Sequence, residues 1–245
     1  MEDFFGYENI GDYFTLFSVE HINMIGLLMV SILLLYIFRH TKRSNVIKYM
    51  ILACLILSEV TLNLWYFMTN TWDIATTLPF QLCTMSVYLS IWMLISEKYH
   101  VFEIVFFIGI GGAIQAILTP ELYYNFPHFR FIHFFIAHIA IILASLYMVF
   151  VKKYKPTLKS LWKSFLCLNV LAFMVFNINQ LTGGNYMFLS RKPTNPSLLD
   201  YLGDYPWYIL SLEGVAIILY FIMYMPFAFT RKRKVERSNT QYFTF

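Results

Sequence analysis

Long apolar stretches separated by short polar connections dominate this chain. An α-helix needs about 20 apolar residues to cross a hydrocarbon core of roughly 30 Å. Seven stretches meet or approach this length, and each is predicted to be a transmembrane helix: 19–38, 46–68, 78–95, 101–118, 129–151, 161–181 and 206–229. The third and fourth are near the lower limit. The pattern therefore predicts an all-α membrane protein with a bundle of seven transmembrane helices.

The composition supports the same interpretation. Hydrophobic residues make up 59% of the 245 residues and charged residues only 13%, whereas soluble domains are about 45–50% apolar and about 25% charged. No segment has the polar composition of a soluble domain, so 1–245 is interpreted as one membrane domain. The first fourteen residues hold four acids and no Lys or Arg. A cleaved signal peptide begins with basic residues, so the first span is expected to be retained.

Basic residues fall mainly on one side of the predicted bundle. Fifteen of the 18 Lys and Arg residues lie near the connections after the first, third and fifth spans or in the tail 230–245. Because Lys and Arg concentrate on the cytoplasmic side, the N-terminus is predicted to be outside and the basic tail in the cytoplasm. The formal charge is +4, and the basic run RKRKVER of the tail is then interpreted as an orientation signal and a contact for anionic lipid head groups. Nucleic acid is therefore not expected as a partner.

Two Gly-rich or Pro-rich segments stand out. The outer connection 182–205 contains a Gly-Gly pair and two prolines, so it is predicted to be a structured loop. Its apolar residues favour a position folded down over the outer face of the bundle. The run GIGGA at 109–113 is predicted to let neighbouring helix backbones approach closely.

Polar side chains inside the predicted spans gather in the outer half of the membrane. An ionisable residue at the bilayer centre costs roughly 2.5–3.5 kcal/mol on insertion scales, so each one needs a reason. The inner halves are almost purely aliphatic and aromatic. A single buried amide can serve helix packing alone, but the cluster as a whole predicts a polar cavity that opens outward. Its members are Glu59, Asn63, Gln81, Cys83, Gln115, His133, His138, Asn177, Asn179 and Glu213, with Arg130 at the interface.

A cysteine and a histidine in this cluster could perform chemistry. Cys83 is the cysteine in the polar half, while Cys54 and Cys167 are expected to act as small hydrophobes. An imidazole can take the proton of a thiol and make it a nucleophile. The predicted depths of Cys83 and His138 differ by roughly 6 Å at 1.5 Å per residue. His133 is the alternative base, and helix packing by these residues is the alternative to catalysis.

A metal site is not expected. The two histidines of the fifth span are five residues apart, which does not place them on one helix face, and no carboxylate lies one turn from either.

Three segments resemble a known family. They are LPFQLCTMS at 78–86, GAIQAILTPEL with FPHFRFIHFFIAH within 112–138, and GGNYMFLSRKP with NPSLLDYLGDYPWYILSLE within 183–213. These motifs resemble the YwaF-type bacterial membrane proteins over nearly the whole chain from the first span onward. The resemblance implies a multi-pass protein of the bacterial cell membrane. That family is distantly similar to an animal acyltransferase that moves polyunsaturated acyl chains between phospholipids with a Cys and a His. By position, these would be Cys83 and His138.

The first functional hypothesis is therefore a lipid acyltransferase or transacylase, with a lipid hydrolase as a close variant. It would act on membrane lipids and needs no soluble cofactor. Gln81, Asn177 or Asn179 would donate to the oxyanion. Arg130 is placed to hold a phosphate. Arg191 and Lys192 of the outer loop are further candidates for a lipid head group.

Two other hypotheses remain open. A transporter or channel would use Glu59 and Glu213 as proton or ion sites. A structural or sensory seven-helix protein would have no chemistry, and its cavity would be filled by side chains. The sequence does not indicate the oligomeric state.

Overall fold

The computed structural model describes residues 2–7, 14–193 and 198–242. Within these ranges the chain is helical and contains no strand, which confirms the predicted all-α class. The long helices are α2 (Val19–Phe38), α3 (Arg43–Met68), α4 (Leu82–Ser96), α5 (Tyr99–Leu118), α6 (Phe129–Phe150), α7 (Leu158–Thr182) and α8 (Trp207–Tyr242). The short elements are α1 (Glu2–Phe5) and two 3-10 helices, η1 (Tyr186–Phe188) and η2 (Leu198–Leu202).

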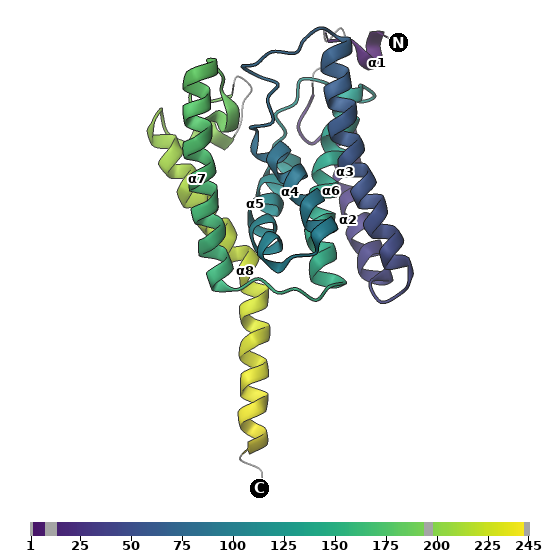
Figure 1. The fold of residues 1–245 in the computed structure, drawn as a ribbon, viewed down its shortest axis with the longest axis vertical. Coiled ribbons are helices and arrows are strands. Elements are labelled where there is room, and N and C mark those ends of the chain that lie inside the picture. The colour runs from purple at the N-terminus through teal and green to yellow at the C-terminus, as the bar shows by residue number, and fades with distance from the viewer. Residues whose placement is uncertain (1, 8–13, 194–197, 243–245) are drawn as a thin grey trace.

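The long helices form one bundle. Within the described ranges, six of them, all except α4, are long and apolar enough to cross a membrane. They run roughly side by side, and the two chain ends lie at opposite ends of the bundle (Figure 1). We call the end that carries α1 the α1 end. The chain is a multi-pass membrane protein, while the count of seven spans and the orientation of the termini remain predictions.

Helix α4 begins later than predicted. The pattern predicted a helix from residue 78, but the helix starts at Leu82, and Gln81 is an extended N-cap with φ −70° and ψ 142°. The Tyr186 hydroxyl accepts a hydrogen bond from the Leu78 N–H at 2.9 Å, which holds this backbone out of the helix. The connection 69–81 descends from α3 into the bundle before α4 starts (Figure 1). This correction places Cys83 on the first turn of α4.

Helix α5 lies at the centre and packs against α4, α6, α7 and α8. Its glycines make the close packing possible. A Cβ at Gly109 would lie 3.1 Å from Ile141 on α6, and one at Gly111 would lie 3.3 Å from Leu219 on α8. A Cβ at Gly112 would lie 3.3 Å from the Leu82 side chain of α4. This is the packing role predicted for the GIGGA run.

The described part of the loop 182–205 lies at the α1 end beside α7 and the start of α8 (Figure 1). Residues 194–197, including Pro196, lie outside the described residues. Tyr186 is fully buried, and its hydroxyl donates to the Ile74 carbonyl at 2.7 Å. The Asn179 side chain accepts from the Tyr186 N–H at 2.8 Å and donates to the Tyr186 carbonyl at 3.0 Å. Tyr186 thereby fixes the loop to α7 and to the connection that precedes α4.

Ion pairs hold the opposite end of the bundle together. Glu97, between α4 and α5, binds Lys48 of α3 at 2.6 Å and Lys152, just after α6, at 2.5 Å. Hydrogen bonds from Lys152 and Lys48 lower the pKa of Glu97. Glu103 of α5 accepts from the Ser160 hydroxyl of α7 at 2.9 Å and also binds Lys163. These contacts fix the helices at the end where the loops are short.

Candidate functional site

A cavity of about 960 Å³ lies within the bundle, and residues of α3 to α8 and of the loop 182–205 line it. Its volume is at the upper end of the range typical of small-molecule sites. Most of the polar residues singled out from the sequence lie on its wall. These are Glu59, Asn63, Gln81, Cys83, Gln115, Arg130, His133, His138, Arg191, Lys192 and Glu213. Most residues of the predicted polar cluster thus line the same cavity.

Two of the predicted cavity residues are elsewhere, and the expectation for them is corrected. Asn177 is exposed and donates to the Phe173 carbonyl of its own helix at 2.7 Å. Asn179 is buried, and its side chain binds the backbone of Tyr186. Both lie on α7, whose cavity-facing residues in the described structure are Leu168 and Ala172. Neither amide is therefore placed to assist chemistry at Cys83.

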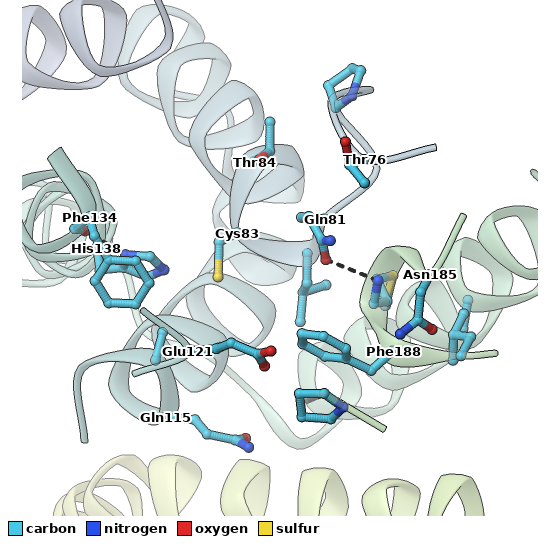
Figure 2. Close-up of a pocket in the computed structure, with 18 of the residues that line it drawn as sticks. Thr76, Gln81, Cys83, Thr84, Gln115, Glu121, Phe134, His138, Asn185 and Phe188 are labelled. Carbon is cyan, nitrogen blue, oxygen red and sulfur yellow. Dashed lines mark hydrogen bonds between the residues drawn. The ribbon is translucent and has the colours of Figure 1, made fainter. Parts of the chain in front are cut away.

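Cys83 is the second residue of α4, and its sulfur points into the cavity (Figure 2). The first N–H groups of an α-helix have no partner within the helix. The helix N-terminus also carries a partial positive charge that stabilises an adjacent anion, including a thiolate. The late start of α4 therefore gives Cys83 electrostatic help that a position inside the helix would lack. The other two cysteines, Cys54 and Cys167, do not line the cavity.

His138 lines the same cavity and is only 6% exposed. Its Nδ1 lies 2.6 Å from the Phe134 carbonyl oxygen. Because a carbonyl can only accept, Nδ1 carries the proton and Nε2 presents a lone pair. The Phe134 ring lies against the imidazole, with ring centroids 4.2 Å apart. Figure 2 shows the imidazole and the Cys83 sulfur turned toward the same part of the cavity.

His133, the alternative base, is held differently. Its Nε2 donates to the Ser58 carbonyl at 3.1 Å and so ties α6 to α3. Its Nδ1 is buried and has no hydrogen-bond partner among the described residues. The lone pair of His133 is thus on the nitrogen nearer the backbone, whereas His138 presents the outer nitrogen Nε2. This difference favours His138 as the base for a group inside the cavity.

Sequence reasoning missed Glu121, which extends from the α5–α6 connection into the cavity (Figure 2). Burial, with the carboxylate of Asp200 as a second cause, raises the pKa of Glu121 to about 7. Only its position directly after Pro120, at the end of a span, could have drawn attention to it. The burial depends on how the distant segment around η2 folds.

Cations also line the cavity. Arg130 lies over the rings of Trp65 and Tyr66, at 5.4 and 5.7 Å from their centroids. Arg191 and Lys192 of the loop 182–205 line the same cavity. Three cationic groups from α6 and the loop thus face one hollow.

The two carboxylates of the transport hypothesis have neutral polar partners. Glu213 of α8 accepts from the Asn169 side chain of α7 at 3.0 Å. Glu59 of α3 lies close to the Tyr88 hydroxyl of α4. Each pair therefore bridges two helices of the bundle.

The chain was compared with known proteins. The model of the TMEM164 family matches residues 16–224. The chain belongs to the TMEM164 family. The match spans α2 to α7 and the first half of α8, and it includes both Cys83 and His138. No curated protein and no solved structure matches.

Membership of the TMEM164 family is consistent with the distant similarity to an animal membrane protein noted from the sequence. The resemblance to the YwaF type remains a prediction.

Proposed function

We propose that this protein transfers acyl chains between membrane lipids, with Cys83 as the nucleophile and His138 as the base. One observation carries the proposal. A thiol on the first turn of α4 and an imidazole with a free Nε2 line the same cavity, and that cavity lies among membrane-spanning helices. Lipid esters are the carbonyl compounds that such a cavity meets most often.

The chemistry follows from the two side chains. His138 Nε2 takes the proton from the Cys83 thiol, and the thiolate attacks the ester carbonyl carbon. The ester C–O bond then breaks, and the leaving lysolipid oxygen takes the proton back from His138. The product is a thioester on Cys83. The hydroxyl of a second lysolipid, or water in the hydrolase variant, attacks that thioester while His138 again takes and returns the proton.

The oxyanion formed in each step needs hydrogen-bond donors. The backbone N–H groups on the first turn of α4 are the nearest candidates, since they have no partner within the helix. Of the three amides first considered for this role, Gln81 is the one on the cavity wall. Its Oε1 accepts from the Met187 N–H at 3.0 Å, which holds the loop beside Cys83 (Figure 2). Gln81 is the N-cap residue of α4, and it thus supports the site by holding the loop in place.

The cations suit a lipid head group. Arg130, Arg191 and Lys192 line the cavity, and guanidinium and ammonium groups bind phosphate through charge-assisted hydrogen bonds. An ester below a phosphate held by these residues would lie toward the membrane interior, on the side of Cys83. This arrangement favours phospholipids over uncharged esters.

The test uses the purified protein in vesicles that contain a phospholipid with a labelled acyl chain and an unlabelled lysophospholipid. We expect label to move to the lysophospholipid and Cys83 to carry an acyl group detectable by peptide mass spectrometry. Cys83→Ala is expected to abolish both signals. Cys54→Ala and Cys167→Ala are matched controls, since these cysteines lie outside the cavity. Equal activity in all three variants would show that Cys83 is not the nucleophile.

A further inference from the structure

A second hollow lies on the bundle surface between α3 and α4, with a volume of about 510 Å³. We call it the α3–α4 groove. Ile56, Val60 and Leu64 of α3 and Ile91 of α4 form its apolar wall. The three α3 residues are 42%, 49% and 53% exposed, so they face outward, where a membrane would lie.

The groove adjoins the cavity that holds Cys83. Glu59, Asn63 and Tyr88 line both hollows. The Tyr88 hydroxyl lies close to the Glu59 carboxylate, and the Asn63 amide donates to the Glu59 carbonyl at 2.8 Å. These three residues therefore form the partition between the two hollows. Their side chains can rotate, which would open a passage from one hollow to the other.

The length and volume of the α3–α4 groove suit the acyl chain of a lipid. Ile91 follows Cys83 by eight residues of α4, which is about 12 Å along the helix axis. An acyl chain whose ester lies at Cys83 could pass the partition and place its methylene groups along the groove. The volume of the groove lies within the range typical of ligand sites. Its outward-facing wall is apolar, and polar groups line the side that faces the cavity.

We propose that the α3–α4 groove binds the fatty acyl chain of a membrane lipid and that this chain reaches the Cys83 cavity through the partition of Glu59, Asn63 and Tyr88. The inference rests on the proposed function for the role of Cys83. The occupant is a hydrocarbon chain because the groove wall is apolar, faces the membrane side and shares three lining residues with a cavity that has polar and cationic groups. A lipid has these two parts in one molecule.

Binding is tested separately from catalysis. The full-length protein is placed in vesicles of phosphatidylcholine that include a phosphatidylcholine with a photoreactive diazirine on its acyl chain. After irradiation, peptides are mapped by mass spectrometry. We expect labels within 56–64 and 88–91. Cys83→Ala is expected to keep these labels while losing acyl transfer.

The groove is then filled by substitution. Val60→Trp is expected to lower labelling of the groove and transfer of a long acyl chain by about tenfold, equivalent to about 1.4 kcal/mol. Turnover of a water-soluble short-chain ester should stay near the wild-type rate. Leu57→Trp is the matched control, because Leu57 is exposed on the same helix but lines neither hollow. Ile91→Trp fills the groove from α4 and replaces the first variant if that variant does not fold.

The outcomes separate the two proposals. Groove labelling without acyl transfer in the wild-type protein would support the chain site and contradict the transferase. If acyl transfer is equally intact in Val60→Trp, Ile91→Trp and Leu57→Trp, the proposal of the chain site is overturned and the transferase proposal is kept. Labels spread evenly over the outward faces of all helices would also overturn the chain site.

Discussion

The Nδ1–H of His138 donates to the carbonyl oxygen of Phe134 on the preceding turn of α6, at 2.6 Å. This bond fixes the tautomer, so Nε2 is free to accept a proton inside the cavity. General bases typically contribute about 10²–10⁴-fold to a rate. We therefore expect His138→Ala to lower the rate of acylation of Cys83 by about 10²–10⁴-fold, measured by mass spectrometry of the acyl-cysteine peptide at early times.

His133→Ala is the control for this experiment. His133 lines the same cavity but binds the Ser58 carbonyl of α3 through Nε2. We expect it to lower thermal stability and to change the acylation rate by less than about tenfold, because a helix contact is lost and the base is kept. A larger loss of rate in His133→Ala than in His138→Ala would reverse the assignment of the base.

Tyr186 is expected to determine the stability of the loop over the cavity. Its hydroxyl contacts both Ile74 and Leu78 in the connection before α4. Tyr186→Phe would remove the partner of the Ile74 carbonyl and of the Leu78 N–H, and a typical intramolecular hydrogen bond contributes about 0.5–1.5 kcal/mol. We expect a clear fall in the unfolding temperature in detergent. Tyr201→Phe should show almost no change, because Tyr201 is 87% exposed.

These residues also show what the sequence can and cannot predict. The six long apolar helices were predictable because a helix that crosses a membrane must supply its own apolar length. The polar residues of the cavity were predictable because polar groups in lipid are costly. The start of α4 was not predictable, because it depends on a hydrogen bond between Leu78 and Tyr186, which lie 108 residues apart in the sequence. Asn179 was assigned to the cavity because the sequence does not show which neighbour a helix face meets. Glu121 was missed because its burial depends on tertiary structure.

Close packing around α5 gives a prediction about stability. A Cβ at Gly109 would lie 3.1 Å from Ile141 and 3.3 Å from Val105, closer than ordinary van der Waals contact. We expect Gly109→Ala to lower the unfolding temperature, since extra atoms in a packed core typically cost about 1–3 kcal/mol. Gly26→Ala is the matched control on α2, because a Cβ there has no neighbour within 4 Å. A higher stability of Gly109→Ala would contradict the packing role.

Glu121 is expected to make the stability of the protein depend on pH. Its pKa is raised to about 7, mainly by burial and also by Asp200. A carboxyl group with a raised pKa favours the folded state when it is protonated, so its contribution is complete below the unfolded value near 4.5 and is lost as the pH rises through about 7. The unfolding temperature of the wild type should fall between pH 5 and pH 8. Glu121→Gln should reduce this fall by a few degrees, at about 2–4 °C per kcal/mol.

The distribution of basic residues predicts the orientation of the chain, and labelling of single cysteines can test it. In a protein with Cys54, Cys83 and Cys167 replaced by Ala, Tyr201→Cys introduces a thiol in η2 at the α1 end, and Lys153→Cys introduces one after α6 at the opposite end. Both positions are exposed. Because Lys and Arg mark the cytoplasmic side, a membrane-impermeant maleimide should label Tyr201→Cys in intact cells and Lys153→Cys only after the cells are opened. The reverse pattern would show that the chain is inserted with its N-terminus in the cytoplasm. It would also place the first turn of α4, and with it Cys83, toward the inner leaflet of the membrane.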